Sequence, residues 1–273
     1  YLEAENAYTD AVLEPTRALQ ESLYSEIVGR IQEDDETVPA KDGDYWYHER
    51  YVPAGEYAVF CRHRGGPKGP ETVLLDGNAL AQGHEFFAVS GLRVSPDQAL
   101  LAYGMDTVGR RFYTLHVRNL GNGGDLPDSL PNTTGNCAWA ADNRTLFYTK
   151  QDPSTLRWDR VYAHVLGTDP AVDRLVFEER DPEFECSVRS TRSRRYLLIE
   201  SEQTLSTETR FLPANDPNGT WTVFLPREAN HEYSIDHWGD DFVVRTNWQA
   251  KNFRVMRVPV GATDKSRWSD IVP

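Results

Sequence analysis

The sequence predicts an all-β fold behind one N-terminal α-helix, and two observations support this prediction. Short segments with the alternating pattern of β-strands follow one another from residue 40 to the C-terminus, separated by turns rich in Gly, Pro and Asn. A pattern of roughly 45 residues recurs along the same part of the chain. With 273 residues, of which 11% are aromatic, the chain can bury a large core and is too rich in rings for intrinsic disorder.

The first 33 residues predict the helix. Pro15 can occupy a first helical position, where its missing N–H costs no hydrogen bond. An apolar residue then recurs at every fourth position and forms one stripe: Leu19, Leu23, Ile27 and Ile31. The acidic run at residues 33–36, followed by Pro39, ends the pattern. A single apolar stripe on an acidic helix predicts that it docks against another surface.

The predicted strands begin with three segments rich in aromatic and apolar residues, at 44–51, 57–62 and 72–76. The repeat is clearest in residues 92–103, where two apolar strands flank the turn Ser95-Pro96-Asp97. The segment 137–149 repeats this pattern, and its Asp142 follows Asp97 by 45 residues. Weaker copies lie at 188–199 and 235–244.

Each copy continues with further strand-like segments. Third strands are expected at 112–120, 160–166, 208–212 and 252–258, and fourth strands at 175–178 and 222–225. Units of roughly 45 residues with four short strands are typical of β-propeller blades. We therefore expect a β-propeller of about five blades, which is either a five-bladed ring or an open part of a larger one. The alternative, a β-sandwich, does not explain the period.

The charge of the chain is concentrated at one end. Residues 1–49 hold 13 acidic and 3 basic side chains, a net −10, out of −13 for the whole chain. This segment is either a solvated helix face with its loop or a region that attracts cationic peptides. Nucleic-acid binding is not expected, because no basic stripe is present. No apolar run approaches the roughly 20 residues that cross a bilayer, so we expect no membrane partner.

The three cysteines, Cys61, Cys137 and Cys186, are far apart and form no CxxC pair, which disfavours zinc ribbons and thioredoxin-like sites. Free buried thiols in a reducing compartment are the simplest explanation, so we expect a cytoplasmic protein. The stretch between His231 and His237 imitates a zinc motif only loosely, since six-residue spacing does not place two ligands on one helix face. We expect no metal and no cofactor.

No strong catalytic signature is present, because the sequence contains neither a GxSxG elbow nor a Walker A loop. The most informative charges lie between two strands of one repeat, where Asp106, Arg110 and Arg111 share a loop. Adjacent arginines can form bidentate pairs with carboxylates of a partner. Glu85, at the entry of the same repeat, could pair with them. The alternative is a solvated hairpin end.

Taken in order, these segments resemble the oligopeptidase B group of the prolyl oligopeptidase family of serine peptidases. The resemblance covers essentially the whole chain. It is carried by residues 1–8, 74–78, 94–97, 106–111, 164–168, 231–234 and 246–254. It implies that residues 1–40 are a helical segment and that residues 41–273 are part of a seven-bladed propeller, next to an α/β-hydrolase domain in cis that this sequence does not contain.

The resemblance also implies an activity for the whole protein, hydrolysis of short peptides after Arg or Lys by a Ser–Asp–His triad. No triad residue can be assigned in this chain, which is expected to be inactive alone and to be a fragment of a longer protein. By the family's motif, Glu85 and Arg111, and next Arg110, correspond to propeller residues that face the catalytic domain and the substrate cavity. The alternatives are a prolyl-specific relative and, from another class, a free-standing propeller that binds peptides or proteins.

Overall fold

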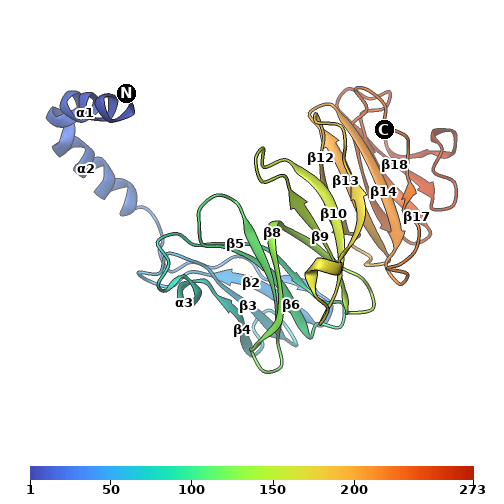
Figure 1. Ribbon diagram of the computed structural model, residues 1–273, viewed down its shortest axis with the longest axis horizontal. Helices are drawn as coiled ribbons and strands as arrows, with labels where there is room; N and C mark the ends of the chain where they lie inside the picture. Colours follow the sequence, from blue (N-terminus) through green and yellow to red (C-terminus); the bar gives the residue numbers. More distant parts are fainter. The chain divides into compact units, whose positions relative to one another are not determined.

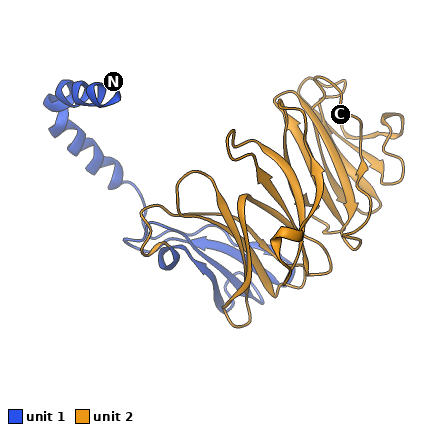
Figure 2. Cartoon of the chain, viewed as in Figure 1, with its two compact units in different colours: residues 1–80 blue, residues 81–273 orange.

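The computed structural model describes all 273 residues, and the chain divides into two compact units, residues 1–80 and 81–273 (Figure 2). The first unit contains the N-terminal helices and one sheet, and the second contains the remaining sheets. The expected boundary between residues 40 and 41 stays a prediction.

The N-terminal segment is helical, as expected, and consists of two stretches. Helix α1 (Leu2–Leu13) and helix α2 (Arg17–Val28) are joined by a 3-10 turn, Glu14–Thr16. Pro15 lies in this turn because it cannot donate the hydrogen bond that a continuous α-helix would need there. Neither helix has a buried residue, and the apolar stripe from Leu19 to Ile31 is exposed.

The sheet of the first unit has four antiparallel strands in chain order. They are β1 (Ala40–Asp42), β2 (Tyr45–Arg50), β3 (Val59–Arg64) and β4 (Glu71–Asp76), followed by the short helix α3 (Gly77–Ala81). The pairing places His48 of β2 opposite Cys61 of β3. The register between β3 and β4 then shifts next to Cys61 and pairs His63 with Glu71.

The second unit begins with a seven-stranded antiparallel sheet whose strands follow chain order (Figure 1). Its strands are β5 (Ala88–Val94), β6 (Leu100–Asp106), β7 (Tyr113–Asn119), β8 (Asp125–Trp139), β9 (Thr145–Gln151), β10 (Trp158–Val165) and β11 (Arg174–Glu178). The 15-residue strand β8 belongs to two meanders, because its first part, up to Thr133, pairs with β7 and the part from Thr133 onward pairs with β9.

Two four-stranded antiparallel sheets complete the unit, again in chain order. The first contains β12 (Glu185–Ser190), β13 (Tyr196–Gln203), β14 (Ser206–Pro213) and β15 (Thr222–Val223). The second contains β16 (Tyr233–Trp238), β17 (Asp241–Thr246), β18 (Arg254–Pro259) and β19 (Ser269–Val272). No sheet closes on itself, and the number of blades stays a prediction.

Hydrogen bonds between successive copies confirm the repeat. The Trp139 indole Nε1 donates to the Arg93 carbonyl at 2.8 Å, and Arg189 Nη2 donates to the Ile235 carbonyl at 2.7 Å, in both cases across 46 residues. The Asp97 backbone N–H donates to the Asn143 side-chain oxygen across the same separation. The sequence repeat therefore places equivalent positions of neighbouring meanders side by side.

Apolar side chains fill the space between neighbouring sheets. One buried cluster joins β8–β10 to β12–β14 and includes Phe147 and Leu197, and another joins β13 and β14 to β16–β18 and includes Phe242. The three cysteines are free and buried, as predicted. Burial raises the pKa of the Cys61 thiol to about 11 and of the other two to about 12. None of the helices combines the length and the apolar character needed to cross a bilayer.

Candidate functional site

The loop between β6 and β7 is organised by the carboxylate of Asp106, which is 1% exposed. Its Oδ1 accepts the backbone N–H groups of Val108 and Gly109 at 2.8 and 3.1 Å, and its Oδ2 accepts that of Arg111 at 2.8 Å. Three backbone donors thus converge on one buried acid. Asp106 therefore fixes the shape of the loop and is not available to pair with the arginines.

Arg111 is held from both sides of its peptide backbone. Its carbonyl accepts a hydrogen bond from Gln151 Nε2 at 2.8 Å, and its φ of 59° lies in the left-handed region, which a non-glycine residue adopts rarely. Its side chain and that of Arg110 are exposed, and neither forms an ion pair or hydrogen bond within the chain. The loop therefore presents two free guanidinium groups on a rigid backbone.

Glu85 lies in the segment before β5, and its neighbour Phe86 connects this segment to the arginine loop. Gly109 has a φ of 82°, and a Cβ there would lie only 3.2 Å from the Phe86 ring. Glycine therefore lets the ring and the loop approach closely. Glu85 is exposed, and no ion pair joins it to Arg110 or Arg111. The structure thus brings the two segments together but not the three charges.

Burial of the nearby Tyr113 raises the pKa of its hydroxyl; Asp106 acts in the same direction and Arg111 in the opposite one. The electrostatic influence of Asp106 and Arg111 therefore reaches the start of β7. The arrangement can recognise acidic groups, since two adjacent guanidinium groups can each bind a carboxylate in bidentate geometry.

Sequence reasoning placed Asp106 in this loop with the two arginines, but it missed the burial of the Asp106 carboxylate and the second anchor of the loop. Gln151, the second anchor, lies 40 residues further along the chain than Arg111. It follows Asp106 by 45 residues, the spacing between Asp97 and Asp142, so the repeat itself contained the signal.

The histidines of the loose zinc-like stretch bind protein groups. His231 Nε2 lies 2.9 Å from Thr246 Oγ1, and His237 Nδ1 lies 2.9 Å from Ser193 Oγ. They also belong to different environments, since His231 packs against the ring of Trp268 and His237 against that of Tyr196. Both therefore have structural partners, and the two rings do not converge on one point.

A buried polar cluster in the second unit is centred on His164. Its Nδ1 lies 2.8 Å from Asp173 Oδ1 and its Nε2 lies 2.9 Å from Asp128 Oδ1, with all three side chains at most 3% exposed. Asp128 also accepts the Gly167 N–H, and Asp173 accepts the Tyr148 hydroxyl. Asp128 and Asp173 therefore hold the buried ring in place through both of its nitrogens.

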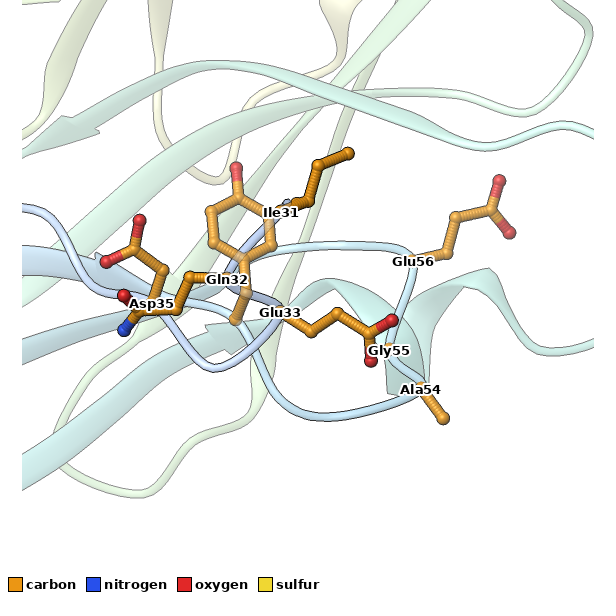
Figure 3. A pocket seen from close by; sticks show the side chains of 8 residues that line it. Ile31, Gln32, Glu33, Asp35, Ala54, Gly55 and Glu56 are labelled. Carbon is orange, nitrogen blue, oxygen red and sulfur yellow. The ribbon is translucent and has the colours of Figure 1, made fainter. Parts of the chain in front are cut away.

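The first unit contains an acidic pocket between the end of the helical segment and the loop after β2 (Figure 3). Three carboxylates, of Glu33, Asp35 and Glu56, line it together with Ile31 and Tyr51, and no basic side chain does. Figure 3 shows the Asp35 and Glu56 carboxylates on opposite sides of the pocket. Its charge is complementary to cationic groups.

Comparison with known protein families identifies the class of this protein. The chain belongs to the prolyl oligopeptidase family: residues 1–273 match the family described as "Prolyl oligopeptidase, N-terminal beta-propeller domain". This confirms the resemblance inferred from the sequence, and the description agrees with the expected type of fold.

Particular relatives refine this placement. The chain is 43% identical to dipeptidyl aminopeptidase BI of Pseudoxanthomonas mexicana and 28% identical to protease 2 of Moraxella lacunata, covering 100% and 95% of this chain. Among solved structures, oligopeptidase B from Leishmania major superimposes with a TM-score of 0.90 at 28% identity over 98% of this chain. Oligopeptidase B from Trypanosoma brucei, in a closed form with covalently bound antipain, gives 0.87 at 26% identity over 100%.

The chain spans 39–40% of the length of each of these relatives. What it shares with them is thus the N-terminal propeller domain, and the activity of a whole protein lies beyond these comparisons.

Proposed function

We propose that this chain is the gating and substrate-selecting propeller of a serine oligopeptidase that hydrolyses short peptides after Arg or Lys. The catalytic serine, aspartate and histidine would belong to an α/β-hydrolase domain in cis. A propeller next to such a site would exclude folded proteins and admit flexible peptides, and its closure would govern access.

The observation that carries the proposal is the arginine loop. Asp106 and Gln151 hold its backbone, while the guanidinium groups of Arg110 and Arg111 have no acidic partner within the chain. Charges prepared in this way suit pairing with carboxylates of a second domain, where ion pairs provide orientation more than net stability. Glu85, on the adjoining segment, would contribute the opposite charge to the same surface.

The matched relatives support the peptidase part of the proposal. Their names describe a dipeptidyl aminopeptidase, a protease and oligopeptidases, and the Trypanosoma brucei structure holds antipain covalently in a closed form. The acidic N-terminal segment, with its acidic pocket, would favour the approach of basic peptides. Buried free thiols fit a reducing compartment, so we place the protein in the cytoplasm.

The test is the variant Arg111→Ala in the full-length enzyme, assayed on a short peptide with one internal arginine. Loss of a charge-assisted hydrogen bond across a domain interface lowers kcat/KM by about tenfold or more. Arg192→Ala is the matched control, because Arg192 is also exposed but lies in the β12–β13 turn, at the opposite end of its meander from the β6–β7 type of loop. Equal kinetics of the two variants, with unchanged melting temperature, would refute the role of Arg111.

A second candidate function comes from the relative that is 43% identical, which is named a dipeptidyl aminopeptidase. Such an enzyme would release dipeptides from a free N-terminus, whereas an oligopeptidase would also cut peptides with a blocked one. Matched peptides with free and acetylated N-termini separate the two, and cleavage after Pro instead of Arg would indicate the prolyl-specific alternative. A free-standing binding module is not favoured, since the relatives are more than twice as long as this chain.

A further inference from the structure

Three strands of the first unit bring potential metal ligands together on one face of their sheet. His48 of β2 lies opposite Cys61 of β3, and the register shift beside Cys61 brings Glu71 of β4 next to both. The ligand atoms of the three residues all lie within 4.8 Å of one another. The set comprises an imidazole nitrogen, a sulfur and a carboxylate oxygen.

The imidazole of His48 lacks the hydrogen bonds that a buried ring normally makes. Its side chain is 1% exposed, and neither ring nitrogen has a hydrogen-bond partner. Leaving a buried polar group unpaired costs about 1–3 kcal/mol, so such groups are rare in folded proteins. Nε2 lies 3.3 Å from Glu71 Oε2 without the geometry of a hydrogen bond.

These distances suit two ligands of one cation. In a tetrahedral zinc site with bonds of about 2.0–2.3 Å, neighbouring ligand atoms lie about 3.3–3.8 Å apart. The His48–Glu71 separation of 3.3 Å already falls in this range. Small side-chain adjustments would bring Cys61 to the same centre.

We propose that His48, Cys61 and Glu71 form a binding site for a zinc-class divalent cation, with a water molecule as the fourth ligand. A mixed nitrogen, sulfur and oxygen donor set suits zinc better than the oxygen-preferring calcium or magnesium. Coordination replaces the S–H bond of Cys61 with an S–Zn bond and releases the proton to solvent.

Neighbouring residues already orient two of the ligands. The His63 ring stacks on His48 with centroids 4.6 Å apart, and its own Nδ1 lies 2.8 Å from the Gly69 carbonyl. Arg50 binds Glu71 through Oε1, at 3.2 Å, and leaves Oε2 facing His48. Such supporting contacts hold metal ligands in position. The bound cation would cross-link β2, β3 and β4, and the charge of Arg50 would moderate its affinity.

The experiment uses full-length protein stripped of metal with a chelator and titrated with Zn²⁺ alone by calorimetry. Wild type is expected to bind one zinc that Cys61→Ser loses, while Glu71→Gln weakens the same site by at least about tenfold. Cys186→Ser is the matched control, because it removes a buried thiol outside the cluster and is expected to bind like wild type. Cobalt as a probe is expected to show a thiolate charge-transfer band that disappears only with Cys61.

Equal zinc stoichiometry and affinity in wild type, Cys61→Ser and Glu71→Gln would overturn the proposal. Should Cys61→Ser not fold, Glu71→Gln decides alone, because this exposed carboxylate can change to an amide without altering the core. The result is independent of peptidase activity, so a failure here leaves the proposed function untouched, and the reverse also holds.

Discussion

Two buried histidines, one in each unit, differ in how their ring nitrogens are hydrogen-bonded. His164 is completely buried, and both ring nitrogens meet carboxylate oxygens at 2.8 and 2.9 Å. His48 is also buried, yet both of its nitrogens lack a hydrogen-bond partner. The surroundings differ accordingly, since His164 lies between two aspartates whereas His48 faces a thiol and one carboxylate oxygen.

This difference indicates different roles for the two rings. A buried ring with every nitrogen satisfied is part of the fold, because removing it strands its partners. A buried ring whose nitrogens make no hydrogen bond contributes little through its polar atoms and retains its capacity to bind a ligand. Substituting one ring at a time tests this assignment of roles.

Removing His164 is expected to have the largest effect. His164→Ala would remove one buried hydrogen bond from Asp128 and one from Asp173, and a hydrogen bond to a charged group contributes about 1.5–3 kcal/mol. The loss in the free energy of unfolding is measured by urea unfolding of the full-length protein, with tryptophan fluorescence as the readout for the sheets of the second unit. His116→Ala is the control, because this half-buried ring makes no hydrogen bond. If His164→Ala lowered the free energy of unfolding no more than the control does, the structural role of His164 would be contradicted.

In metal-free protein, removing His48 is expected to lower the free energy of unfolding less than removing His164 does. His48→Ala creates a small cavity but breaks no hydrogen bond, so we expect the free energy of unfolding to fall by about 1–2 kcal/mol in chelator-treated protein. The same urea experiment measures it. Saturating zinc is expected to widen the gap between wild type and variant, because only wild type would gain binding energy. A loss in metal-free buffer equal to that of His164→Ala would show that His48 is as firmly integrated as His164.

The fold was largely predictable because it is periodic. The turn at Ser95–Asp97 and its copy at Asp142 were visible as a repeat, and the hydrogen bond from Asp97 to Asn143 shows that the two turns lie side by side. Strands that carry no repeat signal were missed, including β1, β19 and the first part of β8. Their residues are mostly exposed and polar, so their position follows from pairing with neighbours and not from their own pattern.

The sites were less predictable because they depend on register. The sequence indicated the arginine loop, but not that Asp106 turns inward to bind its backbone. The cluster of His48, Cys61 and Glu71 was missed altogether, since each residue looked like an ordinary strand position. Only the register shift between β3 and β4 brings Glu71 beside the other two, and one-residue shifts of this kind leave no trace in the sequence.

Substituting a third histidine, His231, is expected to change the stability least. Its hydrogen bonding is intermediate between that of His164 and that of His48. One nitrogen is bonded to Thr246, while Nδ1 lies 3.6 Å from Glu228, which is itself paired with Lys265. Burial lowers the pKa of His231 below 6.5 and Lys265 lowers it further, whereas Glu228 raises it. Because the unfolded ring binds a proton more readily, its contribution to stability is complete above about pH 6.5 and decreases as the pH falls below that value.

The variant His231→Gln tests this sign, because an amide can keep the hydrogen bond to Thr246 and cannot titrate. Between pH 7.5 and pH 5.5, the urea midpoint of the variant is expected to fall less than that of wild type. The fall would not vanish, since burial also lowers the pKa of His116 and His237. Identical decreases in the two proteins would contradict the prediction, because they would mean that His231 is protonated as easily in the folded chain as in the unfolded one.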